Sequence, residues 1–159
     1  MDRIEPDWIE AGWIDADWPA PPSVRAGCTT RLGGVSQGPY ASLNLAEHVG
    51  DDPARVAHNR ALLRERLSLP GEPLWLRQVH GCGVAQAGID ASGCEADAAV
   101  ATGPGLVCGV LTADCLPLLL CDRAGTRVAA VHAGWRGLAS GVIEAAAARM
   151  HRPPADVLA

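Results

Sequence analysis

The chain has 159 residues, and its 13 Lys and Arg against 18 Asp and Glu give a formal net charge of −5 at pH 7. This acidic balance argues against a nucleic-acid-binding protein, because such proteins gain affinity by neutralising phosphates with Lys and Arg. A hydrophobic fraction of 48% with 19% charged residues is typical of a globular domain. The apolar runs are far shorter than the ~20 residues that span a bilayer, so no membrane partner is expected.

The N-terminal segment is acidic and carries tryptophans five residues apart, at Trp8, Trp13 and Trp18. It lacks the basic and apolar regions of a secretory signal, so we expect a cytoplasmic protein whose cysteines are reduced and mostly buried. A spacing of five fits neither a helix nor a strand. We therefore predict that residues 1–22 form an N-terminal arm or edge strand. Its tryptophans either anchor the arm to the body of the protein or contact a partner.

The first half of the remaining chain alternates between strand, loop and helix signals. A strand is predicted over Val24–Arg31, followed by an irregular glycine-rich loop over Leu32–Pro39. A helix is predicted to begin after Asp52, because Asp caps helix N-termini and the proline that follows fits the first turn. It is expected to end before Pro70, and a short strand is predicted over Trp75–Val79.

The second half contains three apolar runs that are typical of buried strands: Leu106–Thr112, Leu116–Cys121 and Arg127–His132. An alanine-rich helix is predicted from about Leu138 to Met150. The last residues, 155–159, resemble the start of a further apolar element.

Three potential metal ligands lie at the ends of predicted strands, where a rigid scaffold can hold functional groups: His80, Cys115 and His132. Two imidazoles and a thiolate suit Zn²⁺, and three protein ligands leave one coordination position for water. The spacing also fits two ordinary histidines and a buried cysteine. Cys82, two residues after His80, is a rival ligand.

Four further polar residues are candidates for substrate chemistry. Asp114 precedes Cys115 and acts as a general base, orients a ligand or merely caps a turn. Arg136 lies near a predicted helix start and Arg31 precedes two glycines; each either binds phosphate bidentately or forms a surface ion pair. Asn44 lies in an apolar frame and either contacts substrate or bonds to the backbone.

Several segments form a recognisable set in this order: TTRLGGVSQGPYASLNLAEHVGDD, an Asn-Arg pair, RQVHG, LTADCLPLLL and VHAGWRGLASGV. Together they resemble the polyphenol-oxidase/YfiH-like family, also called the laccase-domain or DUF152 family, whose members are described as purine nucleoside phosphorylases. The resemblance extends from about Trp18 to the last residue. It implies an α+β fold with layered mixed β-sheets and flanking helices over residues 23–159.

The resemblance also implies a mononuclear zinc held by His80, Cys115 and His132, with copper as an older claim for the family. The implied reactions are phosphorolysis of adenosine, inosine, guanosine and methylthioadenosine, and deamination of adenosine. Purine nucleosides and phosphate would then be the substrates. We interpret three residues as catalytic: Cys115, Asp114 and Arg136. Three are interpreted as contacts to substrate or phosphate: Arg31, Asn44 and Arg136.

The family pattern continues beyond the helix that follows the VHAGWRG segment, whereas this chain stops at Ala159. Residues 23–159 are therefore expected to be an incomplete catalytic domain. Three alternatives stay open. Cys115 serves as a nucleophile with His132 as base in amide hydrolysis; the protein edits peptidoglycan precursors; or it is an inactive metal-binding fragment. A homo-oligomer is compatible with the sequence.

Overall fold

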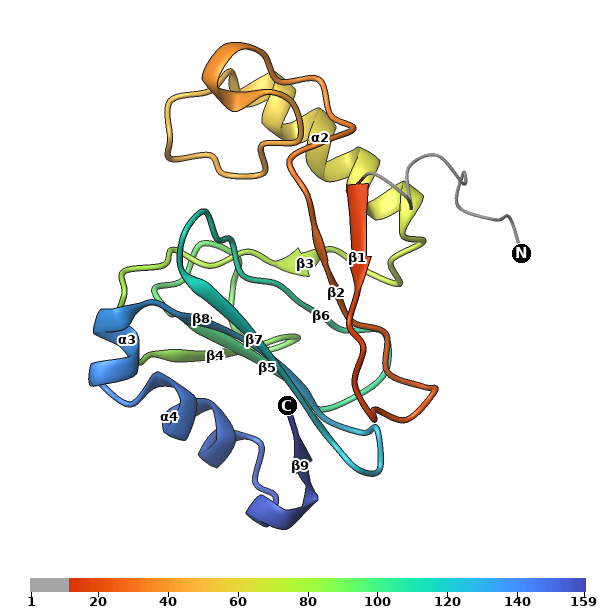
Figure 1. Ribbon diagram of the computed structural model, residues 1–159, viewed down its shortest axis with the longest axis vertical. Helices are drawn as coiled ribbons and strands as arrows, with labels where there is room; N and C mark the ends of the chain where they lie inside the picture. Colours follow the sequence, from red (N-terminus) through yellow and green to blue (C-terminus); the bar gives the residue numbers. More distant parts are fainter. Residues whose placement is uncertain (1–11) are drawn as a thin grey trace. The chain divides into compact units, whose positions relative to one another are not determined.

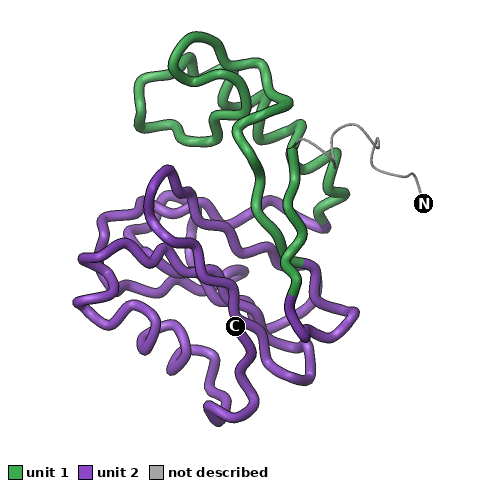
Figure 2. Tube along the Cα trace, in the orientation of Figure 1, with its two compact units in different colours: residues 1–17, 26–69 green, residues 18–25, 70–159 purple. Residues whose placement is uncertain are grey.

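The computed structural model describes residues 12–159 and divides the chain into two compact units (Figures 1 and 2). Unit 1 contains the described residues up to Asp17 together with Ala26–Leu69. Unit 2 contains Trp18–Arg25 and Pro70–Ala159. Trp8 lies outside the described residues, so its part in the predicted arm stays a prediction.

Unit 1 begins with a two-stranded antiparallel sheet of β1 (Trp13–Asp15) and β2 (Gly27–Thr29). The edge strand predicted in the arm forms at β1, and the predicted strand Val24–Arg31 forms only over its middle. A Cβ at Gly27 would lie 2.2 Å from a carbon of the Trp13 ring. Glycine therefore allows the indole ring to lie directly against the neighbouring strand.

The helix of unit 1 is α2 (Pro53–Arg66), which begins and ends close to its predicted bounds. The Asp52 side chain accepts a hydrogen bond from the Ala54 amide at 2.8 Å, which is the predicted N-cap. Buried Asn59 faces the glycine-rich segment, in which the 3-10 helix η1 spans Gly38–Tyr40. Its side-chain amide donates to Ser36 Oγ at 2.9 Å, and its Oδ1 accepts from the Val35 amide at 2.9 Å. The helix thus holds the irregular loop in place.

Unit 2 is built on a five-stranded mixed sheet in the order β4-β5-β8-β7-β9, which confirms the α+β class (Figure 1). The strands span Val84–Gln86 (β4), Ala98–Ala101 (β5), Leu116–Asp122 (β7), Val128–Ala133 (β8) and Val157–Leu158 (β9). Only β4 and β5 are parallel to each other; the remaining neighbours are antiparallel. Strands β7 and β8 confirm two predicted runs to within one residue, while β4 and β5 were not predicted.

Two predicted strands of unit 2 are wrong in extent. Strand β3 covers Pro73–Leu74 instead of Trp75–Val79, and β6 covers only Val107–Cys108. These two strands pair in parallel with each other over two residues each. Gly105, with a φ of +77°, lies in the turn that precedes β6, and the predicted run leaves the extended strand after Cys108.

The predicted C-terminal helix forms as two shorter helices, α3 (Trp135–Ala139) and α4 (Val142–Arg149). Gly141 separates them with a φ of +82°, a left-handed conformation that favours glycine. Helix α4 packs on the five-stranded sheet, and its buried Val142 and Ala146 join a core cluster with Val131 (Figure 1). A 3-10 helix, η2 (Pro154–Asp156), leads into β9, which forms the further element expected at residues 155–159.

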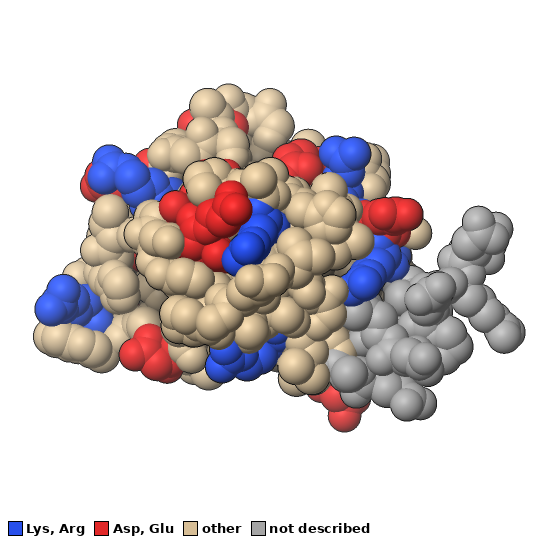
Figure 3. All heavy atoms as spheres, turned by 90° about the horizontal axis from the view of Figure 1, so that it is seen from above, with Lys and Arg blue, Asp and Glu red and all other residues tan. Residues whose placement is uncertain are grey.

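The surface mixes charges of both signs. On the face drawn in Figure 3, acidic and basic side chains lie close to one another. Exposed ion pairs such as Arg77–Glu95 contribute to this mixture. Among the described residues, no helix combines the length and the apolar character needed to cross a membrane.

Candidate metal centre

The three predicted ligands come together in unit 2. His80 lies in the loop between β3 and β4, Cys115 directly precedes β7, and His132 lies in β8. Because β7 and β8 are antiparallel neighbours with Leu116 opposite Ala133, their register brings Cys115 beside the end of the strand that carries His132. The ligand atoms of the three residues all lie within 4.8 Å of one another. This is the one such cluster of three or more His, Cys or acidic residues in the part of the chain that the structure describes.

Gly134 makes room for these ligands. A Cβ at this position would lie 2.8 Å from Cys115 Sγ and 3.2 Å from His80 Cδ2. The first distance is shorter than real Cβ contacts, so any side chain here would displace the thiol. The absence of a side chain therefore lets the Cys115 and His80 side chains approach each other.

Asp97, which was not predicted as a site residue, connects two of the three ligand segments. The residue is fully buried and directly precedes β5. Its Oδ1 accepts hydrogen bonds from the His80 amide at 2.8 Å and from His132 Nδ1 at 2.9 Å. Its Oδ2 accepts from the amides of Gly81 at 2.8 Å and Val79 at 3.2 Å. The one sequence signal was an acidic residue directly before an entirely apolar run.

These hydrogen bonds determine whether Asp97 is ionised and which ring nitrogen of His132 carries the proton. Burial alone would raise the pKa of Asp97, but the hydrogen bonds from His132 and from the backbone of residues 79–81 outweigh burial and hold the pKa below its usual value. Asp97 is therefore ionised at neutral pH and accepts the proton of His132 Nδ1. A neutral imidazole with its proton on Nδ1 presents the lone pair of Nε2, the form that binds metals.

Cys115 is partly exposed, and its environment disfavours the bare thiolate. Burial raises the pKa of its thiol, and the charge and hydrogen bond of Asp114 and the charge of Asp97 raise it further. Without a cation the side chain is thus a protonated thiol and a poor nucleophile, which weighs against the amide-hydrolase alternative. A bound divalent cation favours the thiolate, because coordination deprotonates a thiol.

The residues present therefore fit a metal ion. They offer two imidazoles and one thiol with converging donor atoms, and Asp97 fixes the imidazole form that His132 needs. Cys82, the rival ligand, is exposed and does not belong to the cluster. All six cysteines are free, but only Cys121 is buried, whereas two are exposed and three are partly exposed. The expectation that most cysteines would be buried is therefore wrong.

Large apolar side chains are exposed at positions close to the ligands in sequence. Of the nine that are exposed among the described residues, four lie within six positions of a ligand in sequence. They are Val79, Leu116, Trp135 and Leu138. Trp135 is 73% exposed, and the Arg136 guanidinium carbon lies 5.3 Å from the centroid of its ring. The segments that carry the ligands thus also present apolar surface and a cation to solvent.

The other predicted site residues differ in their surroundings. Asp114 and Arg136 are exposed in unit 2, close in sequence to the ligands. Arg31 and Asn44 belong to unit 1. The Arg31 Nε donates to the Ala41 carbonyl at 2.7 Å. The Asn44 amide nitrogen donates to Asp51 Oδ2 at 3.0 Å, and its oxygen accepts from the Ala46 amide. These bonds agree with the backbone alternative for Asn44, and the substrate contacts of both residues stay predictions.

Most of the chain matches a known protein family. The family model described as multi-copper polyphenol oxidoreductase laccase matches residues 25–159. A purine nucleoside phosphorylase of Pseudomonas aeruginosa is 54% identical over 156 residues, which cover 98% of this chain and 59% of that protein. The purine nucleoside phosphorylase YfiH of Escherichia coli is 50% identical over 142 residues, covering 89% of this chain and 58% of that protein.

Solved structures agree with the fold. A DUF152 protein of Neisseria meningitidis superposes with a TM-score of 0.86 at 49% identity, covering 92% of this chain and 60% of that chain. YlmD of Geobacillus stearothermophilus gives a TM-score of 0.83 at 31% identity, with 93% and 62% covered. The chain spans about three fifths of the length of these relatives. By its sequence, its fold and its matched segment, it belongs to the laccase-domain family of YfiH-like, DUF152 proteins.

Proposed function

We propose that this chain carries the metal centre of a zinc-dependent purine nucleoside phosphorylase. The observation that carries the proposal is the convergence of the donor atoms of His80, Cys115 and His132 within 4.8 Å. The name purine nucleoside phosphorylase, borne by relatives about half identical to this chain, supports the reaction.

Zinc suits this donor set better than copper. Three protein ligands of the His and Cys type are typical of catalytic zinc sites, whereas copper sites with two His and one Cys usually add a distant Met. The described part of the chain has one methionine, Met150, and it is buried in the core cluster beneath α4. When bound, Zn²⁺ supplies a Lewis acid that stabilises negative charge developing on the substrate.

The proposed reaction replaces the bond between the ribose C1′ and the purine N9. A phosphate oxygen forms the new bond to C1′, and the electron pair of the broken bond leaves with the purine, which takes up a proton. Arg136 is proposed to bind the phosphate, because a planar guanidinium pairs well with its oxygens. The exposed ring of Trp135 supports a substrate with a flat apolar face. Arg31 and Asn44 are proposed as further substrate contacts.

The same centre is proposed to deaminate adenosine, in which water replaces the amino group at C6 and ammonia leaves. This reaction needs a group that transfers a proton to the leaving nitrogen. Asp114 is proposed for this role because it is exposed to solvent and adjacent in sequence to Cys115.

The test uses the purified chain loaded with zinc and incubated with inosine or adenosine, with and without phosphate. Chromatography should detect free base that depends on phosphate, and metal analysis should find one zinc per chain. Cys115→Ala, run in parallel, should lose both. Base release that is unchanged in Cys115→Ala contradicts the metal assignment. Zinc binding without base release contradicts the proposed reaction for this chain and supports the alternative of an inactive metal-binding fragment.

The phosphate assignment has its own test. Arg136→Ala should raise the phosphate KM by about tenfold with a smaller effect on the nucleoside KM, since one charged hydrogen-bonding partner is lost. An unchanged phosphate KM would show that Arg136 does not contact the phosphate.

A further inference from the structure

We propose that Asp97 is a positioning residue that fixes the metal-binding geometry of both His80 and His132. This role rests on the proposed metal site, but part of it can be measured in the metal-free protein. Asp97 contacts neither substrate nor metal in this scheme; it acts only through the two histidines. The Asp97 carboxylate binds the loop that carries His80 on one side and strand β8, which carries His132, on the other.

On the loop side, the carboxylate gathers three successive amides. The N–H groups of Val79, His80 and Gly81 all point to its two oxygens, at 2.8 to 3.2 Å. His80 has a φ of +62°, a left-handed conformation that is uncommon for residues other than glycine. Three hydrogen bonds to a buried charge hold the loop in this conformation, which fixes where the His80 side chain leaves the backbone.

On the strand side, Asp97 holds His132 twice. The His132 amide donates to the Asp97 carbonyl at 2.7 Å, and its ring Nδ1 donates to Asp97 Oδ1 at 2.9 Å. The first bond positions the backbone of β8, and the second positions the ring and its proton. With four donors in total, the carboxylate has about as many partners as it has lone pairs.

An amide cannot replace this carboxylate, because each of its two orientations fails at a different ligand. If the amide nitrogen of Asp97→Asn takes the place of Oδ1, it faces His132 Nδ1 as a donor and forces the proton to Nε2. The Nε2 lone pair that binds the metal is then lost. If the nitrogen takes the place of Oδ2, it faces the N–H groups of Val79 and Gly81, and the loop that carries His80 moves.

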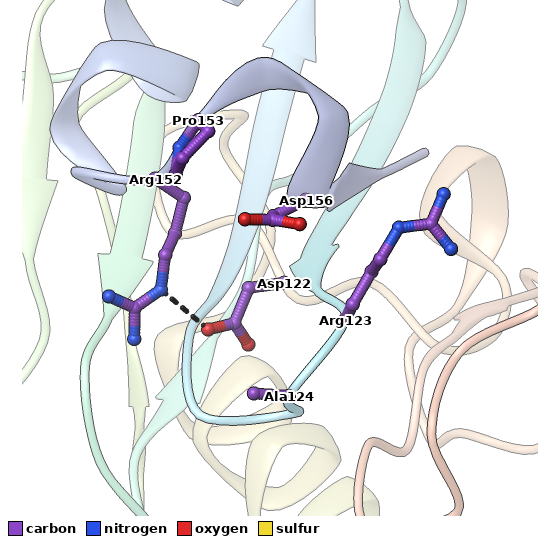
Figure 4. Close-up of a pocket in the computed structure, with 6 residues that line it drawn as sticks. All are labelled: Asp122, Arg123, Ala124, Arg152, Pro153 and Asp156. Carbon is purple, nitrogen blue, oxygen red and sulfur yellow. Dashed lines mark hydrogen bonds and ion pairs between the residues drawn. The ribbon is translucent and has the colours of Figure 1, made fainter.

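The same unit offers a matched control in Asp122, which is 1% exposed and lies at the far end of β7 (Figure 4). Its carboxylate accepts from the Thr126 amide at 2.7 Å, the Arg127 amide at 3.0 Å and Arg152 Nε at 2.8 Å. Asp122 is therefore a buried carboxylate with a comparable set of partners that contacts none of the three ligands. Asp122→Asn should lower the stability of the fold about as much as Asp97→Asn does, without changing any contact of the three ligands.

The experiment compares Asp97→Asn, Asp122→Asn and the unchanged protein by competition titration with Zn²⁺ alone. Asp97→Asn should raise the zinc dissociation constant by 10- to 100-fold, which is the usual effect of removing a group that orients a metal ligand. Asp122→Asn should change it by less than about twofold. In the Co²⁺-loaded protein, the visible spectrum should change in Asp97→Asn only. Equal zinc affinity in Asp97→Asn, or an equal loss in Asp122→Asn, overturns the proposal.

A second measurement needs no variant and no metal. In the metal-free protein at pH 8, nitrogen-15 NMR should find the His132 proton on Nδ1 and an unprotonated Nε2. A proton on Nε2 overturns the proposal, even if Asp97→Asn fails to fold. If the unchanged protein binds no zinc while its His132 has the expected tautomer, the proposed function fails but the positioning of the ring stands.

Discussion

The two ends of strand β7 hold the same kind of group and use it differently. Near Cys115, buried Asp97 gathers loop amides and bonds to His132; near Cys121, buried Asp122 gathers loop amides and bonds to Arg152. Arg152 is a permanent cation, so the ion pair at the Asp122 end is complete in itself. An imidazole bound through Nδ1 keeps a second nitrogen for another partner. At one end the buried carboxylate of Asp122 forms an ion pair that stabilises the fold. At the other end the buried carboxylate of Asp97 orients a potential metal ligand.

One hollow of the surface lies at the structural end of β7, away from the metal-ligand cluster. A hollow of about 350 Å³ lies at the Asp122 end and is lined by the residues drawn in Figure 4. They are Asp122, Arg123, Ala124, Arg152, Pro153 and Asp156. Arg152 pairs with Asp122, and the Arg123 Nε donates to the Ala155 carbonyl at 2.9 Å. Asp122, Arg123 and Arg152 therefore already have partners within the protein, whereas the metal-ligand cluster lies at the other end of the strand.

The largest expected effect separates two cysteines at opposite ends of β7: Cys115, which directly precedes the strand, and Cys121, which lies near its end. Cys115→Ala removes a ligand and should weaken zinc binding by more than 100-fold, measured by competition titration. Cys121→Ala, at the buried end of the same strand, should leave zinc affinity unchanged and lower the free energy of unfolding by about 1 kcal/mol through lost packing. Equal zinc affinity in the two variants would show that Cys115 is not a zinc ligand and that the two ends of β7 do not differ in function.

Arg152→Ala should break the ion pair at the opposite end. It leaves the buried Asp122 carboxylate with its hydroxyl and amide donors but without its cation, while the Arg152 side chain itself is 33% exposed. Solvent screening at the exposed part of Arg152 lowers the contribution of the ion pair to stability. We therefore expect a loss of about 2 kcal/mol in the free energy of unfolding. Urea unfolding measures this loss, and zinc affinity should stay within twofold. A large loss of zinc affinity would mean that the two ends are coupled.

The site also shows which functional residues can be predicted from the sequence and which cannot. His80, Cys115 and His132 were predicted because each lies at the end of an apolar run in the sequence, and two of these runs form β7 and β8. Asp97 was not, because its partners lie 17 and 35 residues away and nothing local marks them. Strand β5 was missed with it, since its sequence AAVA is mostly alanine, which has little preference for strands.

The helices show the same distinction between local and distant causes. The start of α2 was predicted from Asp52 and the proline that follows, because an N-cap is a local interaction. The division between α3 and α4 at Gly141 had a local signal as well, a glycine inside a helical pattern, but a single helix from about Leu138 to Met150 was predicted. Features that depend on distant hydrogen-bonding partners, such as the loop of His80, were beyond sequence patterns.

Gly134→Ala should have a smaller effect at the ligand end. The new Cβ would lie 2.8 Å from Cys115 Sγ, so the thiol must move, and we expect zinc affinity to fall by about tenfold. Gly103→Ala is the matched control, because a Cβ there meets no atom within 4 Å. It should leave zinc affinity unchanged. An equal affinity in both variants would show that the cysteine can move without cost and that the site is less constrained than its contacts indicate.

The smallest expected effect is the first loss of stability at the Asp122 end as the pH falls to about 4. Burial alone would raise the pKa of Asp122, but its hydrogen bonds with Arg152, Thr126 and the Arg127 amide hold it well below its usual value. A lowered pKa in the folded state adds stability above the unfolded pKa of about 3.9, and this stability is lost as the pH falls.

The difference in unfolding free energy between the unchanged protein and Asp122→Asn should therefore be constant from pH 7 to 5. It should shrink by about 0.4 kcal/mol near pH 3.9, where half of the unfolded chains are protonated at this carboxyl, and by about 1.4 kcal/mol per pH unit below that. Urea unfolding at each pH measures the difference. A difference that grows on acidification would mean that Asp122 is protonated in the folded protein, and the ion pair with Arg152 would then not be what completes this end of the strand.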